Sequence, residues 1–96
     1  MEFTPYYKEI IEKATNLYGK EKQKIVAIEE LSELQKELTK DLRRKGNSYN
    51  IAEEMADVLI VWNELLDIYG NKEKVEMFLD YKLERLRQKV REDENK

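Results

Sequence analysis

The sequence predicts an all-α protein, and three observations carry that prediction. Gly and Pro are scarce, with three and one among 96 residues, so few positions interrupt regular helices. Charged and apolar residues each make up 41% of the chain, a balance typical of long amphipathic helices. Apolar residues recur every three or four positions in four successive segments, without the alternation of a strand. A chain of this length has room for one domain, so residues 1–96 are predicted to form a single helical domain.

The first two helices are predicted from their end signals. Thr4 followed by Pro5 has the pattern of an N-cap with Pro at the first helical position, and Gly19 is a suitable terminator. A second helix is predicted from about residue 20 to residue 45, and residues 46–48 form the clearest loop of the chain. The apolar stripe expected on this second helix consists of Ile28, Leu31, Leu34, Leu38 and Leu42.

The third and fourth helices are predicted on either side of a Gly-Asn stop. Asn50 and Glu53 have the spacing of a capping box, so the third helix should begin near Asn50. Apolar residues occur on almost every side of it, which predicts the most buried helix of the domain. Gly70 and Asn71 end it, and a fourth helix runs from about residue 72 to the early 90s, with a frayed tail over about residues 92–96. The expected stripe of this fourth helix is Val75, Phe78, Leu79, Leu86 and Val90.

Composition excludes several classes of function. The net charge of −3 is no nucleic-acid signature, so no nucleic-acid polymer is expected as a partner. Cysteine and histidine are both absent, which excludes disulfides, thiolate chemistry, His-based triads and the usual zinc sites. The first five residues lack the layout of a secretory signal, and no apolar run approaches a membrane span. We therefore expect a cytoplasmic location and no membrane partner.

Two pairs of acids fall at positions where apolar residues would be expected. Glu30 and Glu33 are three residues apart in the second helix, and Glu54 and Asp57 are three apart in the third, so each pair shares a helix face. At about 100° per residue, Glu54 and Asp57 project among the apolar positions of the most apolar helix. Residues 47–70 contain five acids and neither Lys nor Arg, so local salt-bridge partners are missing.

Converging carboxylates in a partly buried site repel one another unless a cation joins them. Hard divalent cations prefer oxygen ligands, so Mg²⁺ or Mn²⁺ fits best. The alternative interpretation is that such acids lie on a solvated helix face and form ion pairs along it. We prefer this interpretation for Glu29 and Glu37. For Glu30 and Glu33 taken alone, the two interpretations stay open. Considered jointly, the two pairs predict a metal site.

The order of these acids resembles that of a known family. Glu29-Glu30-x-x-Glu33, then 20 residues, then Glu54-x-x-Asp57 is similar to the EExxE…ExxD signature of MazG-like and dimeric-dUTPase-like all-α nucleoside triphosphate pyrophosphohydrolases. The resemblance covers roughly residues 25–90 and is nearest to the short, phage- and Firmicute-type members. It implies a four-helix antiparallel bundle of the MazG-like type, completed by assembly into a homodimer or homotetramer. The short chain and its apolar stripes make such assembly physically reasonable.

The resemblance also implies an activity. Glu30, Glu33, Glu54 and Asp57 would hold Mg²⁺, with Mn²⁺ as a substitute, and a (deoxy)nucleoside triphosphate would be hydrolysed to the monophosphate and pyrophosphate. Glu33 and Glu29 are the candidates for the general base. Nucleotide-pool house-cleaning is one role that would suit this reaction.

The basic motif of the family, Lys-x-x-Arg-Arg, is matched here in part. Lys82 and Arg85 occupy the first two basic positions and would bind the phosphates. Leu86 stands in place of the second Arg, and Asp80 stands where an Asn often precedes the motif. A solvated face is the alternative interpretation for Lys82 and Arg85. For the whole protein, the alternative is a non-enzymatic oligomeric helical interaction or regulatory protein.

Overall fold

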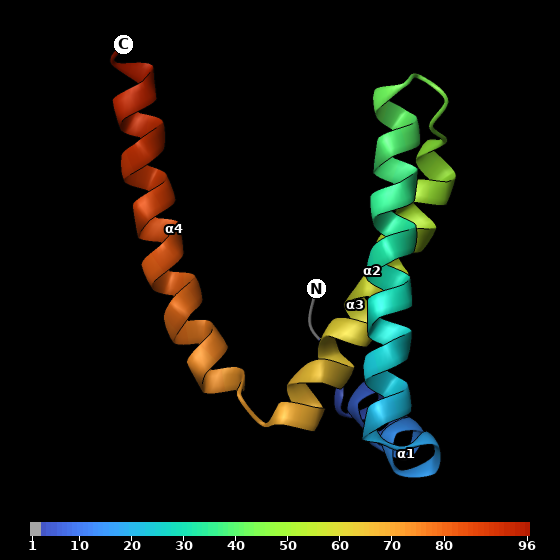
Figure 1. Cartoon of the computed structure of the whole chain (residues 1–96). Coiled ribbons are helices and arrows are strands. Elements are labelled where there is room, and N and C mark those ends of the chain that lie inside the picture. Colours follow the sequence, from blue (N-terminus) through green and yellow to red (C-terminus); the bar gives the residue numbers. More distant parts are fainter. Residues whose placement is uncertain (1–2) are drawn as a thin grey trace.

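The computed structural model describes residues 3–96, and this part of the chain contains four helices and no strand (Figure 1). They are α1 (Pro5–Tyr18), α2 (Lys20–Leu42), α3 (Ser48–Tyr69) and α4 (Lys72–Glu94). The all-α prediction is therefore confirmed. Met1 and Glu2, which belong to the predicted domain, lie outside the described residues.

Both ends of α1 form as predicted. The Thr4 hydroxyl oxygen accepts a hydrogen bond from the Tyr7 backbone N–H at 3.2 Å, and Pro5 occupies the first helical position. Gly19 ends the helix with φ +90°, and its N–H donates to the Thr15 carbonyl at 2.9 Å. This backbone conformation disfavours a side chain, so Gly19 allows α2 to begin immediately after α1.

The predicted end of α2 is wrong by three residues. The helix stops at Leu42 rather than near residue 45, because Arg44 adopts a left-handed conformation with φ +60°. Its N–H donates to the Asp41 carbonyl at 2.9 Å, and the Lys45 N–H donates to the Lys40 carbonyl at 3.0 Å. This pair of bonds is a Schellman motif, in which glycine is the usual residue at the position of Arg44.

The predicted start of α3 is also wrong. The N-cap is Asn47, whose side-chain oxygen accepts from the backbone N–H groups of Tyr49 at 2.8 Å and Asn50 at 3.2 Å. Asn50 therefore lies inside the first turn, and the expected capping box with Glu53 does not form. At the other end, Gly70 closes α3 in the left-handed conformation, as predicted. Helix α4 continues through Glu94, and the expected fraying of about residues 92–96 stays a prediction.

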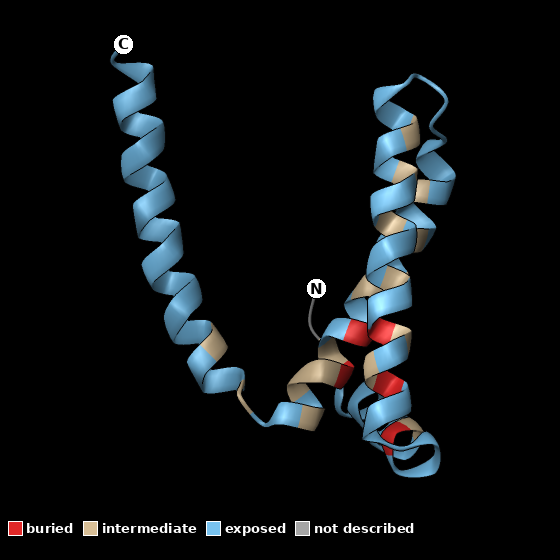
Figure 2. Ribbon diagram, viewed as in Figure 1, coloured by how far each residue is buried: buried red, intermediate tan, exposed pale blue. Residues whose placement is uncertain are grey.

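Helices α2 and α3 form an antiparallel pair, and α1 packs across one end of it (Figure 1). As predicted, α3 has the most buried and half-buried positions of the four helices. The buried residues gather near the α1 end of the pair, as Figure 2 shows. They are Ile11, Thr15, Gln23, Ala27, Val61 and Glu64.

The face by which α2 packs differs from the predicted stripe. The buried and half-buried residues of α2 include a series at helical spacing, Gln23, Ala27, Glu30, Leu34 and Glu37. Leu34 is the only member of the predicted stripe in this series, whereas Ile28, Leu31, Leu38 and Leu42 are exposed. The two stripes are offset by one residue, or about 100° around the helix, so periodicity alone did not identify the side that meets α3.

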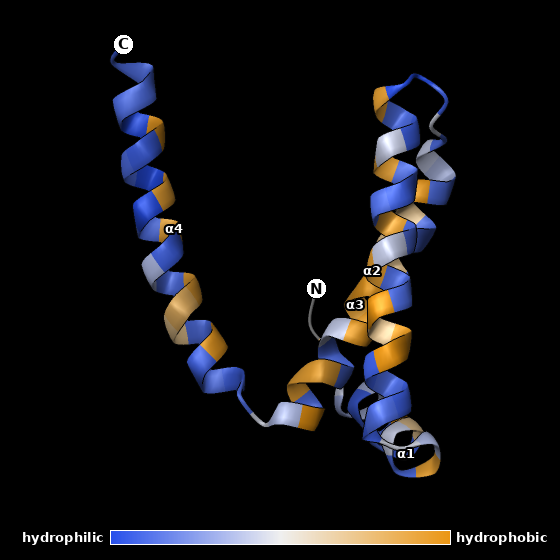
Figure 3. Ribbon diagram, viewed as in Figure 1, coloured by the Kyte–Doolittle hydropathy of each residue, from blue (hydrophilic) through white to orange (hydrophobic). Residues whose placement is uncertain are grey.

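Helix α4 extends away from the other three helices (Figure 1). Val75 is the only residue of α4 that is even half-buried, and apolar side chains recur along its exposed length (Figure 3). One copy of the chain thus packs α1, α2 and α3 together, and the expected four-helix bundle stays a prediction. Within residues 3–96, no helix combines the length and the apolar character that a membrane crossing requires.

Candidate metal centre

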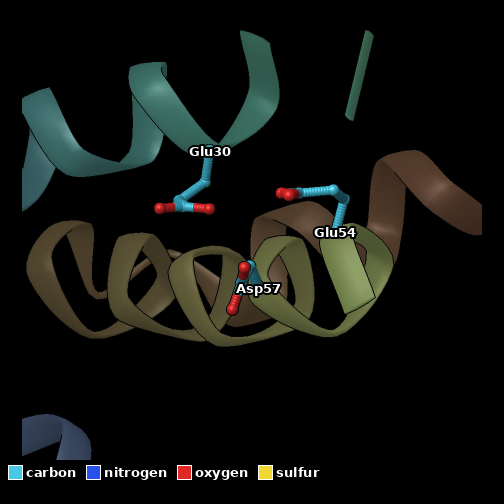
Figure 4. Close-up of side chains that lie close together, drawn as sticks. All are labelled: Glu30, Glu54 and Asp57. Carbon is cyan, nitrogen blue, oxygen red and sulfur yellow. The ribbon is translucent and has the colours of Figure 1, made fainter. Parts of the chain in front are cut away.

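The α2–α3 pair brings three of the predicted carboxylates together. Glu30, Glu54 and Asp57 each offer one carboxylate oxygen, and these three oxygens lie within 4.8 Å of one another. Figure 4 shows Glu30 reaching from α2 toward α3, where Glu54 and Asp57 are carried on the same helix. All three residues are half-buried. The cluster therefore sits at the contact between two helices rather than on a free helix surface.

The local sequence explains why these side chains converge. Glu54 and Asp57 are three residues apart, so they project from neighbouring turns of α3. Glu30 belongs to the series of α2 residues that faces α3, with Ala27 before it and Leu34 after it. The hairpin between α2 and α3 then sets these two faces against each other. Regular helix geometry and one short loop are sufficient to assemble the cluster.

Crowding and burial raise the pKa of two of these carboxyls. The pKa of Glu30 is raised above its ordinary value of 4.5, first by burial, then by the charges of Asp57 and Glu54. A hydrogen bond between the Glu30 and Asp57 side chains also raises it. Burial raises the pKa of Glu54, followed by the charge of Asp57 and then that of Glu33. Each shift means that the ionised form is disfavoured where it stands.

One atom of the cluster is left without a hydrogen bond. Glu54 Oε2 is buried and has no partner among the described residues. An unpaired carboxylate oxygen beside two other carboxylates is electrostatically unfavourable, and a cation at this point would relieve it. The donor set consists of oxygen atoms alone, which suits Mg²⁺ or Mn²⁺. The residues present therefore fit a hard divalent cation.

The fourth predicted ligand, Glu33, is not part of the close group. It is exposed on α2, one turn beyond Glu30, yet its charge contributes to the raised pKa values of both Glu30 and Glu54. Glu33 therefore lies at the rim of the cluster. Glu29 is also exposed, and its position on α2 is about 100° around the helix from Glu30.

The structure does not bring the predicted phosphate-binding residues to the cluster. Lys82 and Arg85 are exposed on α4, along a shallow groove that they share with Leu86, Gln88, Lys89 and Glu92. The Arg85 guanidinium lies over the Tyr81 ring, 5.8 Å from its centroid. Helix α4, which carries these bases, stands apart from α2 and α3, so a single chain does not bring them to the carboxylates (Figure 1).

Sequence reasoning missed one acid beside the cluster. Glu37 was interpreted as part of a solvated face, but its side chain is only 13% exposed and its charge contributes to the raised pKa of Glu54. The Lys40 ammonium pairs with it at 3.4 Å. A signal was present, because Glu37 follows Glu30 by seven residues and therefore lies on the same stripe of α2.

A second missed acid lies two turns farther along α3. Glu64 is only 7% exposed, burial raises its pKa, and its Oε2 has no hydrogen-bond partner among the described residues. Glu64 follows Asp57 by seven residues on α3, and Gln23 precedes Glu30 by seven residues on α2. Because the two helices are antiparallel, Glu64 and Gln23 lie at the same height along the helix pair. Gln23 is also buried. The contact between α2 and α3 is thus polar at two levels.

Comparison with protein-family models, curated proteins and solved structures gives no significant match. The argument for function therefore depends on the site itself and on the order of its acids.

Proposed function

We propose that this protein is a Mg²⁺-dependent nucleoside triphosphate pyrophosphohydrolase of the MazG-like type, active as a homo-oligomer. The observation that carries the proposal is the convergence of Glu30, Glu54 and Asp57 from two helices onto one point. These three residues occupy the second acid of the EExxE motif and both acids of the ExxD motif. The order of the acids suggested the family, and their proximity is what a shared cation requires.

The substrate class follows from charge. A nucleoside triphosphate carries about four negative charges at neutral pH and would be repelled by the carboxylates alone. A bound divalent cation supplies the neutralisation and the polarisation of the phosphates that this chemistry needs. Glu30, Glu54 and Asp57 would hold such a cation through their carboxylate oxygens, because these three side chains converge between the two helices.

Hydrolysis then needs a base at that rim. Two observations support Glu33 in this role: it is exposed to solvent, and its charge contributes to the raised pKa values of Glu30 and Glu54. Glu33 accepts the proton of the water that attacks the α-phosphorus, and the bond from the α-phosphorus to the bridging oxygen breaks. The products are the nucleoside monophosphate and pyrophosphate. Glu29 is the alternative base.

The phosphates also need a positively charged partner, which is the proposed role of Lys82 and Arg85. Lys82 lies within the apolar stripe of α4, between Leu79 and Leu86. Packing of that stripe against an α2–α3 pair, in the same chain or in a second copy, carries Lys82 toward the pair. The exposed stripe of α4 supports such a movement, because an amphipathic helix gains stability by burying its apolar face.

One observation favours a different function. The exposed apolar residues of α4 also suit an interaction module that binds another protein and performs no chemistry. Such a module would be indifferent to divalent cations, whereas the proposed enzyme depends on them.

The decisive experiment measures pyrophosphate release from a panel of canonical and modified (deoxy)nucleoside triphosphates with Mg²⁺, Mn²⁺ or EDTA. Asp57→Asn is compared with Asp67→Asn, which makes the same change at an exposed position ten residues along the same helix. We expect metal-dependent release that Asp57→Asn abolishes and Asp67→Asn retains. Absence of release from every substrate by folded protein would reject the enzyme for that panel and favour the interaction module.

A further inference from the structure

One base of α2 lies at the contact between α2 and α3, beside the carboxylate cluster. Among the described residues, Lys24 and Lys40 are the only Lys or Arg residues that are half-buried, and the others are exposed. The Lys24 ammonium lies over the Tyr69 ring, 4.7 Å from its centroid. The Lys40 ammonium instead pairs with the Glu37 carboxylate, on the stripe of α2 that faces α3. Lys40 is therefore the base that the α2–α3 contact itself holds in place.

Glu37 connects Lys40 to the cluster. The charge of Glu37 contributes to the raised pKa of Glu54, so these two carboxylates lie within electrostatic reach of each other. Among the ion pairs of the described residues, the Lys40–Glu37 pair is the only one whose carboxylate contributes to a raised pKa in the cluster. Side chains on a helix lean toward its N-terminus, and the cluster lies on that side of Lys40. The Lys40 ammonium is thus directed back along α2 toward the cluster.

Lys40 keeps both the access and the hydrogen-bonding capacity that a ligand needs. Its side chain is 41% exposed, whereas that of Glu37 is 13% exposed. An ammonium has three N–H donors, and within the described part of the chain one of them donates to Glu37. The distance of 3.4 Å is long for a hydrogen bond between charged groups, so a stronger acceptor can replace Glu37. An anion that reaches this point therefore meets a positioned and available base.

The contact between α2 and α3 is open in one direction from the cluster and closed in the other. Toward α1, Ala27 is 2% exposed and Val61 is 3% exposed, and the buried carboxyl of Glu64 follows them. Beyond Ala27, in contrast, no residue of α2 is buried, so the contact is more open toward the α2–α3 hairpin. Lys40 lies on this open side, and residues 43–45 add three exposed bases after it. A chain of phosphates that starts at the cluster can extend only toward the hairpin.

We infer that Lys40 binds the terminal phosphates of a nucleoside triphosphate, whose phosphate chain runs from the carboxylate cluster toward the α2–α3 hairpin. The inference rests on the proposed function, because the cation at the cluster is the other contact of the same phosphate chain. A terminal phosphate, like a phosphate monoester, carries about 1.5–2 negative charges at pH 7, so the most negative end of the substrate meets the basic end of the hairpin. Lys40 supplies, within a single chain, the positive charge that Lys82 and Arg85 do not bring to the cluster.

The experiment measures binding of inorganic tripolyphosphate by isothermal titration calorimetry in saturating Mg²⁺. Lys40→Met is compared with Lys36→Met, which removes the same charge four residues nearer to the cluster along α2. Lys36 is exposed and is turned by about 120° around the helix from Glu30, so it does not face α3. We expect Lys40→Met to raise Kd by roughly tenfold or more, and Lys36→Met to leave it nearly unchanged. Lys40→Arg, which keeps the charge, should retain most of the affinity.

A double variant separates phosphate binding from a purely structural role of the ion pair. Lys40→Met alone leaves the largely covered Glu37 carboxylate without its partner and should lower Tm. The double variant Glu37→Gln, Lys40→Met removes both charges, so Tm should recover while Kd stays raised. Glu37→Gln alone frees the ammonium and should bind tripolyphosphate at least as tightly as the unsubstituted protein. Recovery of binding in the double variant would overturn the inference, because Lys40 would then act only as the partner of Glu37.

Pyrophosphate release from nucleoside triphosphates, measured on the same samples, distinguishes this inference from the proposed function. If the unsubstituted protein releases pyrophosphate and Lys40→Met binds tripolyphosphate as well as Lys36→Met does, the inference is wrong and the proposed function stands. If tripolyphosphate binding depends on Lys40 but no triphosphate is hydrolysed, the phosphate site stands and the proposed enzyme is rejected. Absence of tripolyphosphate binding by the unsubstituted protein would also overturn the inference.

Discussion

Glu30 and Asp57 face each other across the contact between α2 and α3, and each offers a carboxylate oxygen within 4.8 Å of the other's. Burial, followed by the charge of Asp57, raises the pKa of Glu30, so the ionised form of Glu30 is disfavoured where it stands. A proton on Glu30 would relieve this repulsion, and so would a cation held between the two groups.

The first prediction concerns pH in the absence of divalent cations. Glu30, Glu54 and Glu64 have pKa values raised above 4.5, so the folded state binds protons more tightly than the unfolded state. The stability that these groups contribute is complete below about pH 4.5 and is lost as the pH rises through their raised values. We expect the free energy of unfolding in EDTA, measured by urea titration, to fall as the pH rises from 4.5 toward 7. A rise over this interval would contradict the raised pKa values.

The second prediction concerns binding of Mg²⁺. A cation that binds only the folded protein stabilises it by about 2.7 kcal/mol when its free concentration is 100 times Kd. Addition of Mg²⁺ should therefore raise Tm, and Glu54→Gln should abolish this increase. In EDTA, the same variant should be at least as stable as the unsubstituted protein, because it relieves repulsion at the cluster. Glu21→Gln, at an exposed position in the first turn of α2, should keep the full response to Mg²⁺.

The third prediction tests the bases of α4. Lys82→Ala and Arg85→Ala should each lower kcat/KM by roughly tenfold or more, since a charge-assisted hydrogen bond contributes about 1.5–3 kcal/mol. Both side chains are exposed, so Tm should hardly change. The control is Arg87→Ala, because Arg87 is already paired with Glu84 at 2.6 Å on the same helix. Equal kinetics in all three variants would remove Lys82 and Arg85 from the site.

The fourth prediction separates the observed cap of α3 from the one expected from sequence. Asn47→Ala removes the side-chain oxygen that accepts two backbone N–H groups and should lower the free energy of unfolding by about 1 kcal/mol. Asn50→Ala should change it by less than about 0.5 kcal/mol, because Asn50 is exposed inside the first turn. Chemical denaturation of the two variants side by side distinguishes the caps. The reverse order would place the N-cap at Asn50.

The sequence was sufficient where one residue determines the local backbone. Thr4, Gly19 and Gly70 have strong conformational preferences, and each ends or begins a helix as predicted. The three-residue spacing of Glu54 and Asp57 likewise fixes their common face, so two of the three members of the cluster followed from α3 alone.

The sequence was insufficient where the outcome depends on competition between neighbours. Asn47 and Asn50 are both good caps, and the hairpin geometry selected the first. Arg44 adopts the left-handed conformation that glycine usually adopts at the end of a helix. Because Arg is not typical of this position, its residue type did not indicate where α2 ends. The positions of Lys82 and Arg85 depend on what α4 packs against, and periodicity within one chain does not specify that partner.

The one-residue offset between the series of α2 residues that faces α3 and the apolar stripe predicted for α2 makes the helical phase of α2 as important as its composition. Deletion of a single residue between Ala27 and Glu30 would turn every later side chain by about 100°. Leu31, Gln35 and Leu38 would then occupy the places of Glu30, Leu34 and Glu37 opposite α3. The α2 side of the contact would then carry two leucines and a glutamine at these places, and Asp57 and Glu54 would have lost their carboxylate counterpart on α2. Almost the same amino acids, shifted by one position, would encode a helix pair without the carboxylate cluster.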